Sequence, residues 1–152
     1  MARITIQVGR EVLDLPPAVH ETIAVELEPK ARKAYQALET QIQAQIEDGT
    51  VTVSNGLVQL LRLQEATSGS VRGDDGCMRV VSTAKRNALR ELLEAAGGEP
   101  VVVFGRFRQD LDTVHAVASE LGIESCELSG RRHELDAWKG SIQVIAVQIQ
   151  AG

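Results

Sequence analysis

Two short segments near the N-terminus alternate apolar and polar side chains with a period of two. They are residues 4–8 and 22–27, and Pro16 and Pro17 interrupt the chain between them. Such alternation is typical of strands with one buried face, and paired prolines mark an interruption. The pattern therefore predicts leading strands within residues 1–28.

From Pro29 onward the apolar residues recur at helical spacing instead. One stripe of apolar side chains runs from Ala31 to Ile46, and Asp48-Gly49 follows it. Proline is favoured in the first turn of a helix and glycine just after its end. The spacing therefore predicts an amphipathic helix from Lys30 to this stop.

Two further helices are predicted before the chain turns more apolar. The first takes Asn55 as its N-cap and ends at Ser68-Gly69, and the second follows Thr83 and ends at Gly97-Gly98. Shorter elements are also expected here, namely strands at 50–53 and 78–81 and a turn at 74–76. Residues 29–98 are thus predicted to be mainly helical.

After Pro100 short apolar strands alternate with helices. The strands are expected at 101–104, 124–128 and 142–149, with helices through Leu111–Leu121 and around Leu135–Trp138. This alternation implies right-handed crossovers and a parallel sheet covered on both faces. Residues 99–152 are therefore predicted to be an α/β core.

The last predicted strand runs almost to the end of the chain, at Gly152. An uncovered parallel strand would leave backbone groups without partners. An incomplete domain within a larger protein is therefore expected, and a natural short chain is the alternative. We also expect some self-association through the exposed sheet edge.

Composition narrows the function classes. The 152 residues carry a net charge of -5 and only four aromatic side chains. An acidic chain is not expected to bind DNA by charge alone, and scarce aromatics argue against a base-stacking surface. No apolar run is long enough for a membrane span or a signal peptide, so we expect a cytoplasmic protein. Cys77 and Cys126 are too far apart in the sequence to indicate a zinc site or a disulfide framework.

Motifs for autonomous catalysis are absent from the sequence. It has neither Gly-x-x-x-x-Gly-Lys-[Ser/Thr] nor Gly-x-Gly-x-x-Gly, and its three histidines are scattered without metal-binding spacing. Ser129, His115 and Asp136 could be combined into a triad, but no Gly-x-Ser-x-Gly elbow supports it. No metal site or catalytic residue is predicted.

The strand ends carry the remaining chemical signal. The strand at 101–104 leads into Gly105, Arg106 and Arg108, and the strand at 124–128 leads into Ser129-Gly130-Arg131-Arg132. Guanidinium groups and backbone amides at a helix N-terminus suit phosphate oxygens, and parallel sheets bind ligands at the carboxyl ends of their strands. Solvated turn residues are the alternative interpretation, and Lys85 is interpreted as a solvated residue in the first turn of a helix.

Segments in a fixed order resemble the second RecA-like lobe of Swi/Snf-type superfamily-two helicase-like ATPases, particularly the compact bacterial and phage members. Residues 101–107 resemble helicase motif IV, 127–130 the short motif after it, and 144–152 the first half of motif V. Further similar segments are 15–27, the helix with Tyr35, 60–69, 82–93 and 138–140. The resemblance spans nearly the whole chain.

This resemblance implies that residues 1–152 form a single partial helicase C-terminal domain, a RecA-like parallel sheet with flanking helices preceded by a helical segment and truncated within motif V. The parent would be an ATP-dependent translocase on double-stranded DNA that uses ATP and Mg²⁺. The first lobe's phosphate-binding lysine loop and Asp-Glu box, and the arginine-bearing motif VI, are missing here. The fragment alone is therefore expected to hold no cofactor and to be inactive.

Within the fragment, the resemblance places a set of residues at the DNA-facing or interlobe edge. They are Arg106, Ser129, Gly130, Gln148, Gln150 and Gly152, with Arg108 and Arg132 as secondary candidates. The main alternative function is a non-catalytic protein-interaction module whose partner surface is the helical region 30–70. A generic α/β small-molecule or nucleotide-binding protein is a further alternative.

Overall fold

The computed structural model describes residues 17–49, 53–73, 76–139 and 142–149. The predicted strand at 4–8 lies outside these residues. The prediction of a strand at 22–27 is wrong, because residues 17–28 are extended but belong to no sheet. Most of their side chains are exposed, including Ile23 and Val25. The alternating apolar residues therefore do not form the buried face of a strand.

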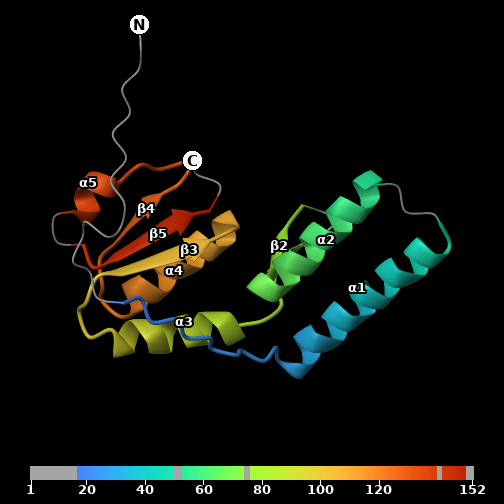
Figure 1. The fold of residues 1–152 in the computed structure, drawn as a ribbon, viewed down its shortest axis with the longest axis horizontal. Helices are drawn as coiled ribbons and strands as arrows, with labels where there is room; N and C mark the ends of the chain where they lie inside the picture. The colour runs from blue at the N-terminus through green and yellow to red at the C-terminus, as the bar shows by residue number, and fades with distance from the viewer. Residues whose placement is uncertain (1–16, 50–52, 74–75, 140–141, 150–152) are drawn as a thin grey trace, which may run out of the picture.

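An antiparallel pair of helices follows. Helix α1 spans Pro29–Glu47 and helix α2 spans Val53–Ser68. Pro29 opens α1 and Gly49 follows it with φ of 66°, as the sequence predicted. Asn55 lies inside α2 and is not its N-cap, and Val53 belongs to the same helix and not to a strand. Figure 1 shows the two helices side by side, projecting away from the parallel sheet.

A small hairpin joins α2 to the rest of the chain. Strand β1, Ser70–Arg72, pairs antiparallel with β2, Met78–Val80, and only β2 was predicted. Gly69 turns the chain into β1 with φ of 100°, and a Cβ there would lie 2.7 Å from the Ser82 carbonyl oxygen. This position therefore requires glycine.

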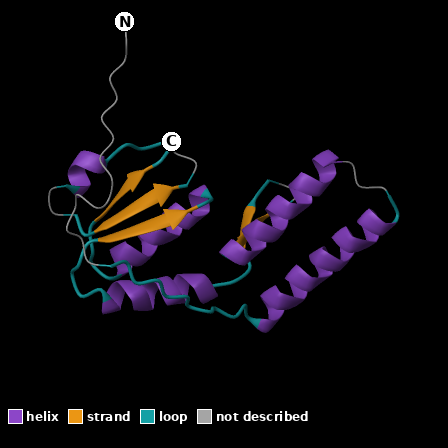
Figure 2. Ribbon diagram, in the orientation of Figure 1, coloured by secondary structure: helices purple, strands orange, loops and turns teal. Residues whose placement is uncertain are grey.

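The α/β core has the predicted order of elements, and Figure 2 shows its strands with helices beside them. They are α3 Ala84–Ala95, β3 Val101–Gly105, α4 Arg108–Glu120, β4 Ser125–Leu128, α5 Leu135–Trp138 and β5 Val144–Gln148. The three strands are parallel in the order β3-β5-β4, which confirms the predicted parallel α/β fold.

Helices α3 and α4 cover one face of this sheet. The buried cluster there comprises Leu93, Leu111, Val114, Val117, Val144 and Ala146. On β3, Val101 and Val103 pack against it, whereas Val102 and Phe104 point to the opposite face and are 42% and 66% exposed. Among the described residues the prediction that both faces are covered is therefore wrong for β3, whose second face has no covering helix or strand.

Glu28 links the start of the helical pair to the core. Its carboxylate accepts hydrogen bonds from the Ser82 hydroxyl and from the backbone N–H and hydroxyl of Thr83, the latter two at 2.9 Å. These bonds lower the pKa of Glu28 from 4.5 to about 2. Thr83 is the N-cap residue of α3 as predicted, but its side chain makes no capping bond. Glu28 accepts the Thr83 N–H, and the Ser82 hydroxyl accepts the Ala84 N–H.

Candidate nucleic-acid interface

The carboxyl ends of the three parallel strands meet at one edge of the core. Gly105 of β3 lies opposite Gln148 of β5, and Leu128 of β4 lies opposite Val147. Arg106, Gln148 and Ser129 therefore lie along the same edge, as the sequence predicted from strand order. Gln150 and Gly152 fall outside the described residues, so their predicted role stays a prediction.

The turn between β3 and α4 is held by Asp110. Its carboxylate accepts the backbone N–H groups of Arg106 at 3.0 Å and of Phe107 at 2.8 Å. Gly105 makes this approach possible, because a Cβ there would lie 2.8 Å from the Asp110 Cβ and 2.9 Å from Leu111 Cδ1. Both N–H groups therefore already donate hydrogen bonds within the fold. The prediction that backbone amides of this turn bind phosphate is wrong for these two groups. The guanidinium groups remain the phosphate-binding candidates of this turn.

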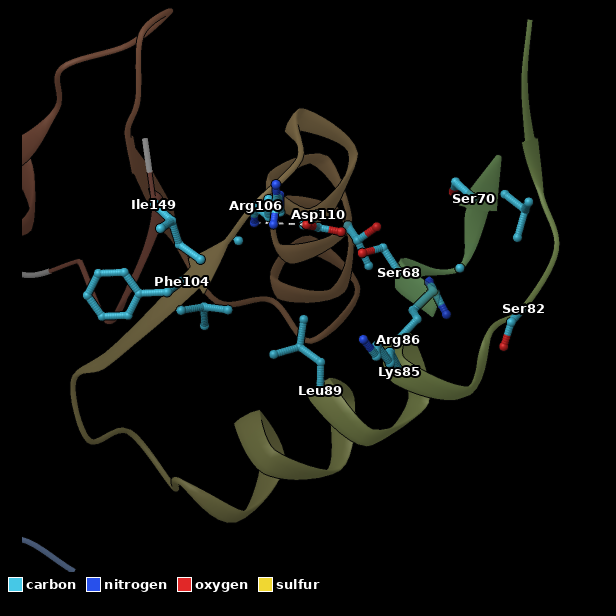
Figure 3. Close-up of a pocket in the computed structure, with 15 residues that line it drawn as sticks. Ser68, Ser70, Ser82, Lys85, Arg86, Leu89, Phe104, Arg106, Asp110 and Ile149 are labelled. Atoms are coloured by element: carbon cyan, nitrogen blue, oxygen red, sulfur yellow. Dashed lines mark hydrogen bonds between the residues drawn. The ribbon is translucent and has the colours of Figure 1, made fainter. Parts of the chain in front are cut away.

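Arg106 is exposed between two cavities. One, of about 340 Å³, is lined by Arg72, Arg108 and Gln148 as well as Arg106. The other, of about 400 Å³, lies on the α3 side, and its lining includes Lys85, Leu89 and Phe104 (Figure 3). Both cavities thus combine positive charge with the end of a strand.

The positively charged side chains at this edge differ in whether they form ion pairs. Arg86 pairs with Glu120, whereas Arg106, Arg108 and Lys85 form no ion pair with any residue that the structure describes. The Arg106 guanidinium carbon lies 5.8 Å from the centre of the Phe107 ring, within cation–π range. These three side chains are therefore free to meet an anion.

In the loop after β4, the Ser129 side chain is already hydrogen-bonded within the fold. Ser129 is buried, its hydroxyl donates to Glu127 Oε1, and it accepts the backbone N–H groups of Arg131 and Arg132 at 3.1 and 3.3 Å. Gly130 and Arg132 are exposed. Of the predicted residues in this loop, Gly130 and Arg132 are thus accessible to a ligand, whereas the Ser129 side chain is used within the fold.

A buried polar cluster centred on Glu127 holds the conformation of this loop. The fully buried carboxylate accepts hydrogen bonds from Arg131 at 2.8 and 2.9 Å, and Arg131 also contacts Asp112 at 2.5 Å. His115 Nε2 lies 3.1 Å from Glu127 Oε2, and its Nδ1 lies 2.7 Å from the Ser125 hydroxyl. Arg131, the largest cause, lowers the pKa of Glu127 to about 2. Arg131 is therefore paired with two carboxylates of the fold, although its side chain is still 31% exposed.

The possible triad is not assembled. His115 contacts Ser125 and Glu127, and Asp136 lies beside Lys139. Sequence reasoning missed the Glu127 cluster, although a glutamate within a predicted parallel strand, followed by an arginine four positions later, was a usable signal. Across the described residues no group of histidine, cysteine and carboxylate side chains could hold a metal ion. No described helix is long and apolar enough to span a bilayer.

Comparison with known proteins identifies one sequence relative and a solved structure of similar fold. No family model matches the chain. It is 28% identical over 100 residues to "Putative protein p41" of Acyrthosiphon pisum secondary endosymbiont phage 1, covering 65% of this chain but only 22% of that protein. The chain also superposes, with a TM-score of 0.71 and 20% identity, on the Sulfolobus solfataricus SWI2/SNF2 ATPase core solved in complex with double-stranded DNA. That match covers 93% of this chain and 33% of the archaeal one, so the chain spans about a third of that core. The chain has the fold of a RecA-like lobe of a Swi/Snf-type helicase-like ATPase core.

Proposed function

We propose that this chain is the second motor lobe of a DNA-dependent ATPase of the Swi/Snf type and contributes DNA contacts and interlobe surface to it. One observation carries the proposal, the fold match to a SWI2/SNF2 core over 93% of the chain. The order of the motif-like segments supports the second lobe over the first. Arg106 would contact the phosphate backbone, together with Arg108, Gln148 and Arg132 along the same edge.

The described residues do not by themselves fit ATP or Mg²⁺. Two backbone N–H groups of the β3–α4 turn donate to Asp110. The described residues hold no cluster of side chains that could bind a cation. Phosphoryl transfer needs a metal, a phosphate cradle and a charge-stabilising arginine together. The hydrolase activity would therefore belong to the intact parent, in the cytoplasm, where the first lobe provides these groups. The isolated chain would release no phosphate from ATP with or without DNA.

A salt titration of DNA binding tests the proposal. A fluorescent 20-base-pair duplex is titrated with the 152-residue chain and with Arg106→Ala, and anisotropy is read at several salt concentrations. Losing one phosphate contact should reduce the slope of log K against log salt by about 0.9. Lys33→Ala, an exposed cation on α1, is the matched control and should leave the slope unchanged.

Two results would count against the proposal. Equal slopes for Arg106→Ala and Lys33→Ala would remove Arg106 from the DNA surface. Absence of any duplex binding, even at low salt, would leave this lobe without a DNA contact of its own.

The second candidate function is a protein-interaction module. Leu57, Val58, Leu60 and Leu61 of α2 are all more than 40% exposed, which is unusual for one short stretch of helix. Tight partner binding by α1 and α2 in a chain that does not bind DNA would favour this alternative.

A further inference from the structure

The β4–α5 loop, residues 129–133, is closed by hydrogen bonds at its base. The Glu134 N–H donates to the Glu127 carbonyl, and the Glu127 N–H donates to the Glu134 carboxylate, both at 2.9 Å. Within the loop, the Ser129 N–H donates to the Arg132 carbonyl at 2.8 Å. The backbone of the loop is therefore folded back on the end of β4.

A buried charge lies beneath this loop. Glu127 is 0% exposed and lies opposite Ala146 of β5, on the sheet face that α4 covers. Its carboxylate accepts hydrogen bonds from the Ser129 hydroxyl and the Arg131 guanidinium, both of which belong to the loop. The loop is thus tied by two of its side chains to a carboxylate that solvent does not reach.

The same cluster also holds the loop backbone and joins the loop to α4. While the Ser129 hydroxyl donates to Glu127, it accepts the N–H groups of Arg131 and Arg132. The Arg131 guanidinium contacts Asp112 of α4 at 2.5 Å. Each donor and acceptor named here belongs to a described residue, so the arrangement depends on no other part of the chain.

Stability alone does not account for a buried ion pair at this position. Apolar side chains of similar volume often replace such a pair with no loss of stability. The pair does fix geometry, because the planar guanidinium of Arg131 meets the two oxygens of Glu127 at 2.8 and 2.9 Å. The loop whose geometry it fixes carries Gly130 and Arg132, which are exposed at the carboxyl end of β4.

We propose that Glu127 and Arg131 are positioning residues, which hold the β4–α5 loop in the conformation that presents Gly130 and Arg132 to a DNA phosphate. This inference rests on the proposed function. Glu127 is buried and acts only through the loop. The Arg131 side chain is 31% exposed, so direct contact of its guanidinium with DNA is the alternative that the test must separate.

Hydrogen exchange, read by NMR on the 152-residue chain, tests the loop without DNA. Glu127→Gln should accelerate exchange of the Arg131 and Arg132 amides about tenfold or more relative to the core amides, because the glutamine Nε2 cannot accept a guanidinium bond. Ser129→Ala leaves the ion pair in place and should accelerate the same two amides by removing their acceptor. Gly69→Ala strains a distant turn and is the matched control, which should leave these two amides unchanged.

Duplex DNA binding, read by anisotropy, separates positioning from charge. Glu127→Gln removes a negative charge, so charge alone would tighten binding, whereas loss of positioning should weaken it about tenfold. Arg131→Lys keeps the positive charge but not the planar fork, so it should weaken binding to a similar extent. Gly69→Ala should bind DNA as the unmodified chain does. Urea midpoints verify that each variant is folded under the binding conditions.

Several outcomes would overturn the proposal. One is unchanged exchange of both loop amides in Glu127→Gln, and another is faster exchange with equal or tighter DNA binding. Full DNA affinity in Arg131→Lys, with a loss in Arg131→Ala, would make Arg131 a direct phosphate contact instead. If the unmodified chain binds no DNA, the proposed function fails and the DNA role of the loop fails with it. The exchange rates would then still decide whether Glu127 holds the loop.

Discussion

Replacing Arg131 by alanine should expose how much the buried Glu127 carboxylate depends on its partner. A carboxyl whose pKa is lowered from 4.5 to about 2 is stabilised in its charged form by about 3 kcal/mol. Arg131→Ala removes the largest cause of that stabilisation and leaves a charge that is fully buried. Breaking a buried ion pair from one side costs about 3–5 kcal/mol, so we expect a loss near 3 kcal/mol at pH 7.

The pH dependence has a definite sign. Because the pKa of Glu127 is lower in the folded state, its contribution is present above about pH 4.5 and is lost as the pH falls toward 2. In Arg131→Ala burial favours the neutral acid, so Glu127 would protonate readily. The cost of the substitution should therefore shrink to about 1 kcal/mol near pH 3, because the unfolded carboxyl is protonated there while the folded one lies about one pH unit above its own pKa.

Urea denaturation at pH 7 and pH 3 measures both numbers. With a slope of about 1–3 kcal/mol per molar urea, a loss of 3 kcal/mol moves the midpoint by about 1–3 M. Arg132→Ala is the matched control, because Arg132 is the adjacent exposed arginine and should change stability by less than about 0.5 kcal/mol. The reasoning fails if both variants cost the same at pH 7, or if the cost of Arg131→Ala is independent of pH.

Two further predictions concern backbone geometry. Gly69→Ala should destabilise the chain by more than about 2 kcal/mol in urea unfolding, since φ of 100° and the nearby Ser82 carbonyl both oppose a Cβ. Gly130→Ala, where no atom lies within 4 Å of the new Cβ, should be nearly neutral, and equal costs would contradict this account. Asp110→Ala should cost about 1 kcal/mol by releasing two backbone N–H groups at the start of α4. Asp110→Asn should retain most of that stability, and a reversed ranking of the two variants would show that the cap is not the cause.

The α/β core could be predicted from the sequence because its signals are local. A short apolar run such as Val101–Phe104 and a helical stripe such as that before Gly122 each indicate their own element, and right-handed crossovers then fix a parallel sheet. Residues 22–27 show the limit of this reasoning. Alternation shows that a segment could be half buried, but a strand also needs a neighbour, which no local pattern reveals. The cover over Val102 and Phe104 depends on tertiary context in the same way.

The candidate site was predictable in position but not in detail. Strand order alone brings Arg106, Gln148 and Ser129 to one edge. The sequence could not distinguish Arg131 from Arg132, because only the fold shows that the Arg131 side chain donates hydrogen bonds to Glu127. Likewise Asp110, three residues after the helix N-cap, determines which backbone donors remain free at the β3–α4 turn.

The hydrogen bonds of Glu28 bear on how this protein could have been put together. Because they join the residue before α1 to Ser82 and Thr83, residues 29–81 begin and end at nearly the same point, beside the start of α3. Residues 29–81 therefore resemble an insertion whose two ends lie next to each other. Insertions with adjoining ends disturb a host fold least. This segment could therefore be lengthened, exchanged or deleted as a unit during evolution while the parallel sheet and its strand ends keep their geometry.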